Sequence, residues 1–163
     1  MIPKIKRVLY ATDLGDNSKY AFRYAVNTME KHNAEMIILH VIEPMPSGIR
    51  SYFAEDDEKW TKAKAKSGEL ADDIRRRIDK FCKEELREKE KCLERIKKIE
   101  INEGYPADQI LKTADDQNCD VIIMGNHGKG RLTYTFLGSV SERVLRRTKK
   151  PVFIIPLPEK EDG

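Results

Sequence analysis

The chain has few cysteines, little net charge and no long apolar run. Cys82, Cys92 and Cys119 are its three cysteines, and their spacing suits neither a disulfide framework nor a zinc ribbon. The 31 Lys plus Arg nearly balance the 28 Asp plus Glu, so composition gives no sign of nucleic-acid binding. No stretch approaches the roughly 18 consecutive apolar residues of a membrane span, and residues 1–7 lack the apolar core of a signal peptide. We therefore expect a cytoplasmic protein with reduced thiols.

The length and the apolar content are those of one folded domain. The 163 residues include 39% hydrophobic and 36% charged residues, which leaves enough apolar sequence for a core in a charge-rich chain. We expect a single domain over residues 1–163.

Short apolar runs alternate with helical patterns along the chain. The runs predict strands at residues 7–12, 36–42, 96–101, 120–124 and 152–155. Spacings of three and four predict helices over residues 18–32, from Pro106 to about Asn118, and from Ser139 onward. Strands that alternate with helices form parallel sheets through right-handed crossovers. The fold class is therefore α/β, with three layers and helices on both faces of the sheet.

The connection at about residues 43–94 is unusually long. It carries apolar residues at helical spacing, namely Trp60, Ala63, Ser67, Leu70, Ile74, Ile78 and Phe81. This pattern predicts one long helix, or two helices broken near Gly68. Acidic and basic residues are interspersed along it, which indicates a solvated helix face with i,i+4 ion pairs rather than a charged binding surface.

A glycine-rich segment follows the fourth predicted strand. Gly125, Gly128, Gly138 and Ser139 form the pattern G-x2-G-x9-G-S, and a helix begins at its end. Glycines let backbone N–H groups approach phosphate oxygens, and a helix N-terminus adds unpaired donors and a positive dipole end. The segment therefore predicts a phosphate cradle. The alternative is a tight turn with no ligand.

Two further residues have both a structural and a ligand-binding interpretation. Ser139 with Glu142 has the spacing of a capping box, which by itself would explain both residues. Asp13 ends the first strand, where it either faces a ligand or forms a turn with the residues that follow. Because the carboxyl ends of parallel strands share one edge, Asp13 and Gly125 are expected to face the same crevice.

Together these segments resemble the universal stress protein family, specifically its nucleotide-binding branch, which has the phosphate motif G-x2-G-x9-G-[ST]. Residues 8–13 resemble the family's opening strand, residues 120–125 its later core, and Pro151 with Val152 its final strand. The resemblance covers the chain outside the 43–94 connection. It implies a Rossmann-like, five-stranded parallel sheet in the order 3-2-1-4-5, with ATP at the carboxyl edge.

The same resemblance implies the residues of the binding site. Thr12, Asp13 and Val41 would lie around the adenosine. The phosphates would be surrounded by Gly125, His127, Gly128, Gly138, Ser139, Val140 and Ser141. A Mg²⁺ ion between phosphate oxygens needs few protein ligands, so we predict neither a protein metal site nor a catalytic residue. We interpret His127 as a ligand contact and His40 as structural.

We thus expect an ATP-binding regulatory protein of the stress response that hydrolyses ATP slowly if at all, because no water-positioning base or arginine finger is evident. The last strand, Val152–Ile155, would lie at a sheet edge, which favours a homodimer.

The alternatives are a dimeric interaction protein that has lost the nucleotide and uses the long charged helix, and a nucleotidyl- or phosphotransferase. The basic residues between Lys129 and Lys150 leave nucleic-acid binding as a weaker alternative.

Overall fold

The computed structural model describes residues 1–15, 18–44, 57–126 and 137–156, and over residues 57–67 it describes the backbone alone. The strands are β1 (Arg7–Thr12), β2 (Glu35–Ile42), β3 (Ile96–Glu103), β4 (Val121–Gly125) and β5 (Val152–Ile155). The helices are α1 (Ser18–His32), α3 (Asp57–Glu85), α4 (Glu90–Glu94), α5 (Pro106–Asp116) and α6 (Ser139–Arg147).

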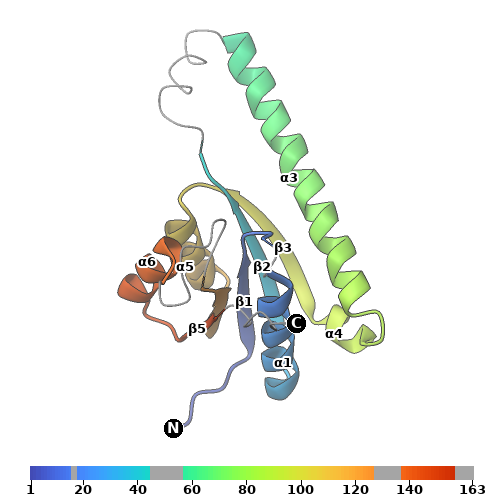
Figure 1. Ribbon diagram of the computed structural model, residues 1–163, viewed down its shortest axis with the longest axis vertical. Coiled ribbons are helices and arrows are strands. Elements are labelled where there is room, and N and C mark those ends of the chain that lie inside the picture. The colour runs from blue at the N-terminus through green and yellow to red at the C-terminus, as the bar shows by residue number, and fades with distance from the viewer. Residues whose placement is uncertain (16–17, 45–56, 127–136, 157–163) are drawn as a thin grey trace, which may run out of the picture.

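The five strands form one parallel sheet in the order β3-β2-β1-β4-β5, which confirms the predicted fold class and order. β1 lies at the centre, with Thr12 beside His40 of β2 and Ala11 beside Met124 of β4. Helices α1, α3 and α4 cover one face of the sheet, and α5 and α6 cover the other (Figure 1). The strand order reverses between β1 and β4, and in such sheets ligands bind at the carboxyl edge beside this reversal.

The central strands are apolar throughout because both of their faces are buried. Val8 and Tyr10 of β1 pack toward α1 and α3, whereas Leu9 packs toward α5 and α6. Full burial of such a side chain stabilises the fold by about 1.5–3 kcal/mol. The continuous apolar runs in the sequence follow from this burial on two sides.

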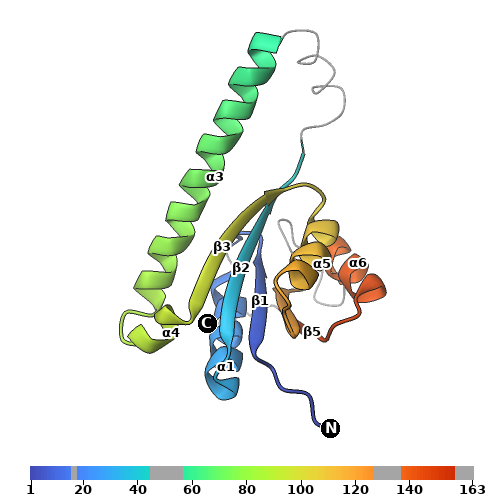
Figure 2. The ribbon, with the colours of Figure 1, turned by 180° about the vertical axis from the view of Figure 1, so that it is seen from behind.

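The long connection contains one unbroken helix, α3, which continues through Gly68. Ile74 and Ile78 are buried against the sheet, but Leu70 is 47% exposed. Among the residues whose side chains the structure describes, the predicted apolar stripe is buried from Ile74 onward, and the amino-terminal part of α3 extends beyond the carboxyl edge of the sheet (Figures 1 and 2). The short helix α4 was not predicted.

The predicted capping box is wrong. Gly138 is the N-cap of α6, and its carbonyl accepts the Glu142 N–H at 2.9 Å without any side-chain cap. Ser139 is therefore the first helical residue, and the Glu142 carboxylate pairs with Arg146 at 2.7 Å. Because α6 begins one residue earlier than the capping box requires, neither the Ser139 nor the Glu142 side chain stands at a capping position.

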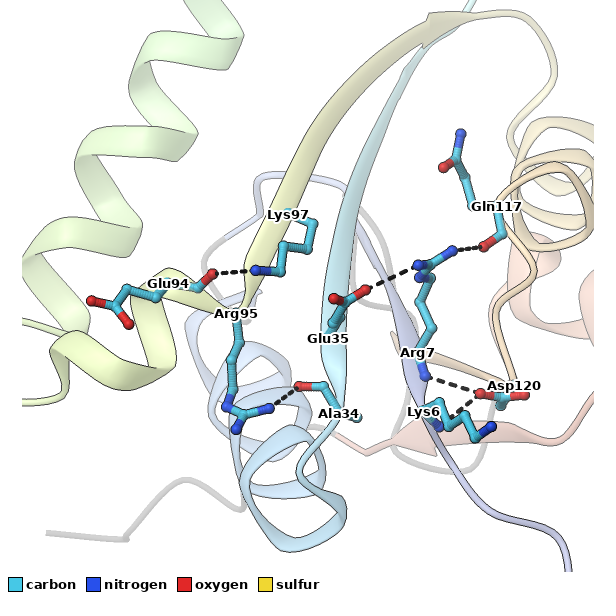
Figure 3. Close-up of polar contacts among 9 residues, drawn as sticks. All are labelled: Lys6, Arg7, Ala34, Glu35, Glu94, Arg95, Lys97, Gln117 and Asp120. Atoms are coloured by element: carbon cyan, nitrogen blue, oxygen red, sulfur yellow. Dashed lines mark hydrogen bonds and ion pairs between the residues drawn. The ribbon is translucent and has the colours of Figure 1, made fainter.

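The amino-terminal edge of the sheet is held by side chains that bond backbone groups (Figure 3). Asp120 Oδ2 accepts the N–H groups of Lys6 and Arg7 at 2.7 and 2.9 Å. The Arg7 guanidinium donates to the Gln117 carbonyl and to Glu35. These contacts tie β1 to its two neighbours at the edge opposite the candidate site.

Candidate functional site

The loop after β1 is shaped by its own side chains. Asp13 Oδ1 accepts the Gly15 N–H at 2.8 Å, and Thr12 Oγ1 accepts the Leu14 N–H at 3.1 Å. Leu14 has a φ of 61°, a left-handed conformation that side chains other than glycine seldom adopt. A Cβ on Gly15 would lie 3.0 Å from Asp13 Oδ1, so any larger residue would require the Asp13 carboxylate to shift. The turn-forming interpretation of Asp13 is thus confirmed for one of its two carboxylate oxygens.

His40 supports the end of β1 from the neighbouring strand. Its Nδ1 lies 2.8 Å from the Thr12 carbonyl oxygen, so this nitrogen carries the proton and donates it. The sequence analysis interprets His40 as a structural residue. In the fold, its contact with Thr12 places it directly beside the predicted site. This contact depends on the strand register, which pairs Thr12 with His40, so it could not be predicted from the sequence.

The end of β4 is joined to the start of α6. Gly138 donates its N–H to the Asn126 carbonyl at 3.1 Å. The buried Ser141 hydroxyl lies 3.0 Å from the Gly125 carbonyl oxygen and 3.3 Å from that of Asn126. These bonds hold the first turn of α6 at the carboxyl end of β4.

The first turn of α6 places at this edge backbone N–H groups that have no acceptor within the helix. The Glu142 N–H makes the first bond of the helix, so the N–H groups of Ser139, Val140 and Ser141 have no acceptor within it. The Ser139 side chain is exposed and Val140 is half-buried. Together with the positive dipole end, these donors form a general anion-binding arrangement.

The predicted site residues divide into two groups. Thr12, Gly125 and the first turn of α6 meet at the carboxyl edge where the strand order reverses, and Asp13 follows Thr12 directly. Val41 and Val140 each pack against the apolar cluster on the α5–α6 face. His127 and Gly128 lie outside the described residues. The part of the chain that the structure describes thus includes the two ends of the glycine motif but not its middle.

Burial keeps the phenol nearest this loop in its neutral form. Tyr10 Oη donates to the Ser18 carbonyl at 2.7 Å, and burial raises the pKa of Tyr10 well above its ordinary range. Tyr10 therefore acts as a hydrogen-bond donor that fixes the start of α1. Among the described residues, no group of three or more His, Cys, Asp or Glu side chains is arranged to hold a metal ion.

The fold and the geometry of this edge define a doubly wound α/β protein with a helix N-terminus at its switch point. The universal stress protein family profile matches residues 4–156, and the chain belongs to that family. Within the described part of the chain, no helix has the length and apolarity needed to cross a membrane.

Known relatives agree with this assignment. The chain is 30% identical to universal stress protein MJ0577 of Methanocaldococcus jannaschii over 92% of this chain and 94% of that protein. The solved structure of MJ0577 superimposes with a TM-score of 0.69 and covers 94% of this chain and 96% of that one. A universal stress protein solved in complex with cAMP shares the fold, with a TM-score of 0.53 and 23% identity over 94% of this chain and 98% of that one.

Proposed function

We propose that this universal stress protein binds ATP at the carboxyl edge between β1 and β4, with a divalent metal held mainly by the phosphates. The observation that carries the proposal is the first turn of α6, where three N–H groups that have no acceptor within the helix stand beside the end of β4. The glycine spacing in the sequence continues the same cradle. A family member with cAMP bound is compatible with an adenine nucleotide as ligand.

The proposed contacts follow the two ends of the site. Thr12, Asp13 and Val41 surround the adenosine, and Asp13 retains one carboxylate oxygen that the turn does not use. The phosphates lie among Gly125, His127, Gly128, Gly138, Ser139, Val140 and Ser141. Backbone N–H groups are the main donors, because the Ser141 hydroxyl already donates to a carbonyl.

A magnesium ion fits this site through phosphate oxygens rather than a protein cage. The oxygen of Asp13 that lies outside the turn and the Ser139 hydroxyl are the hard donors that Mg²⁺ prefers. When bound, the ion would neutralise part of the phosphate charge. The protein contributes backbone donors and the shape of the loop.

A substitution at Ser139 tests where the phosphates lie. Ser139→Asp places a carboxylate at the first helical position, where it favours the α6 dipole but repels phosphate. Ser139→Asn is the uncharged control of nearly the same size. We expect ATP–magnesium affinity to fall at least about tenfold in Ser139→Asp and to change less than about threefold in Ser139→Asn, measured by calorimetry on nucleotide-free protein.

Equal affinity in both Ser139 variants would exclude the α6 terminus as the phosphate site. The nucleotide that copurifies with the wild-type protein, released by heat and identified by chromatography, provides an independent check. Failure of the wild-type protein to bind ATP would make the glycine loop structural.

The nucleotide is proposed to be sensed or held rather than rapidly consumed. A turnover on the order of 1 per second that is abolished in His127→Ala would contradict this part of the proposal. We propose in addition that the protein has a regulatory role in the stress response and a cytoplasmic location. It is proposed to be a single domain that forms a homodimer through β5.

Nucleic-acid binding has less support, because three of the basic residues of α6 and the segment after it have partners among the described residues. Arg146 pairs with Glu142, and Arg147 pairs with Asp108. Lys150 donates to the Cys119 carbonyl at 2.6 Å.

A further inference from the structure

His40 of β2 holds the last peptide unit of β1, which joins Thr12 to Asp13. Its Nδ1–H donates to the Thr12 carbonyl at 2.8 Å. Thr12 is the last residue of β1, and the register pairs it with His40 itself, whereas the pairing of β1 with β4 ends one residue earlier, at Ala11. The imidazole therefore holds the chain at the point where it leaves the sheet.

The same bond sets the direction in which Asp13 leaves β1. The C=O and N–H of a trans peptide unit point in opposite directions, and the described chain contains no cis peptide bond. The Lys6 carbonyl, an even number of positions before that of Thr12, faces β2 in the same way, because it accepts the Glu35 N–H at 2.9 Å. With the Thr12 carbonyl on the β2 side, the N–H of Asp13 points to the other side of β1, where β4 lies.

Asp13 is thus fixed on both sides, by His40 before it and by its own turn after it. Asp13 Oδ1 accepts the Gly15 N–H at 2.8 Å, which leaves Oδ2 outside the turn. The strand order reverses between β1 and β4, and the proposed adenosine lies at this reversal. A residue that binds a ligand has to be held within about 0.5 Å of its working position, and hydrogen bonds from a supporting residue provide that constraint.

From these contacts we infer that His40 is a positioning residue of the nucleotide site, which orients Asp13 toward the adenosine through the Thr12 carbonyl and does not itself touch the nucleotide. The inference rests on the proposed function and concerns its adenosine end alone, because the phosphates are proposed to lie at the first turn of α6. His40 therefore contributes to the selection of a nucleotide over a bare polyphosphate.

Two substitutions at position 40 separate the hydrogen bond from the imidazole ring. In His40→Asn the amide nitrogen is bonded to Cγ, as Nδ1 is in histidine, so a donor remains near the Thr12 carbonyl. His40→Leu has the same branched shape without a donor, and both variants lose the ring. We expect His40→Leu to weaken the binding of adenosine and of ATP–magnesium about tenfold and His40→Asn less than about threefold, measured by calorimetry on nucleotide-free protein.

Tripolyphosphate distinguishes positioning from a general loss of structure. His40→Leu is expected to bind magnesium tripolyphosphate within about threefold of the wild-type affinity, because the α6 terminus lies apart from the bond that is removed. Ser139→Asp is expected to show the opposite pattern, with weaker binding of tripolyphosphate and unchanged binding of adenosine. A merely structural role of His40 would weaken the binding of both ligands together.

A measurement on the wild-type protein decides if His40→Leu does not fold. ¹⁵N NMR of the ring nitrogens is expected to show that Nδ1 of His40 carries a proton in the nucleotide-free protein. An unprotonated Nδ1, equal adenosine affinity in the two His40 variants, or equal loss of adenosine and tripolyphosphate binding would each overturn the inference and leave the proposed nucleotide function intact. A wild-type protein that binds neither ATP nor adenosine would contradict both.

Discussion

Ser139 and Ser141 lie two residues apart in the first turn of α6 but have opposite surroundings. Ser139 is exposed, whereas Ser141 is 2% exposed and bonded to the carbonyl of Gly125. The resemblance to the family assigns both to the phosphate site. In the structure, the Ser139 side chain is available to a ligand, whereas the Ser141 side chain fixes α6 to β4.

Alanine at these two positions is expected to separate stability from binding. Ser141→Ala removes a buried donor and should lower the free energy of unfolding by about 1–2 kcal/mol. Ser139→Ala should change it by less than about 0.5 kcal/mol and weaken ATP binding instead. Urea denaturation and calorimetry measure the two quantities. A stable Ser141→Ala protein would show that the hydroxyl does not hold the turn.

The three cysteines are buried thiols without any disulfide. Burial raises the pKa of Cys82 to about 12 and that of Cys119 to about 11. For Cys82 the nearby Asp79 carboxylate adds to the effect. Both thiols therefore stay protonated in the folded protein at neutral pH, which makes them poor nucleophiles.

The raised pKa of Cys82 predicts a loss of stability in alkali. The unfolded thiol ionises from about pH 9, whereas the folded one does not until about pH 12, so stability is full below pH 9 and falls as pH rises toward 12. Between pH 8 and pH 10 the loss from this group is about 1 kcal/mol. Cys82→Ala should lessen the fall by that amount in urea titrations under reducing conditions. The same pH slope in both proteins would contradict the argument.

At the scale of elements, α3 packs on the sheet through its carboxyl-terminal half, which buries Ile74, Ile78 and Cys82. Leu70 is 47% exposed, and the amino-terminal part of the helix extends beyond the edge of the sheet (Figure 1). Ion pairs between neighbouring turns, such as Asp79 with Lys83 at 2.6 Å, support the solvated-face interpretation made from the sequence.

Two glycines in different elements should respond oppositely to alanine. Gly68 lies inside α3, and nothing stands within 4 Å of the place that an alanine Cβ would take, so Gly68→Ala should raise the free energy of unfolding by about 0.5–1 kcal/mol. Gly104 has a φ of 150°, and its Cβ would lie 2.9 Å from Gln109 Nε2. Gly104→Ala should therefore cost about 1–3 kcal/mol. Denaturant titration of both variants checks the signs, and a destabilised Gly68→Ala would mean that the helix is not intact there.

At the scale of the whole molecule, β5 is an edge strand with only β4 beside it. The Phe153 side chain is 40% exposed there. An apolar edge with unpaired backbone groups is a site where a second chain can pair, which supports the proposed homodimer.

A charge on this strand tests the dimer. Phe153→Lys is expected to give a monomer, because two cations would meet across a symmetric edge. Leu145→Lys is the matched control, since Leu145 is 42% exposed on α6 rather than on the strand. Sedimentation velocity at micromolar concentration distinguishes the states. A monomeric wild-type protein, or a dimeric Phe153→Lys protein, would refute the β5 interface.

Local patterns predicted the five strands, the helices α1, α5 and α6 and the fold class, but not the short helix α4. The central strands follow from apolar runs buried on two faces, and α1 ends where predicted, at Asn33 with its φ of 54°. The ends of the glycine motif were located by spacing alone, because G-x2-G-x9-G-S links a strand to a helix. The resemblance supplied the strand order. The cap of α6 was missed because an N-cap depends on backbone angles, which Ser139 and Glu142 do not determine.

Only packing between distant segments decided the rest. The contact of His40 with Thr12 depends on strand register, the burial of Ser141 on the docking of α6, and the exposure of Leu70 on where the sheet ends. Such features join residues far apart in sequence. The contacts stabilise the protein only when the segments pack together, so no local sequence pattern predicts them.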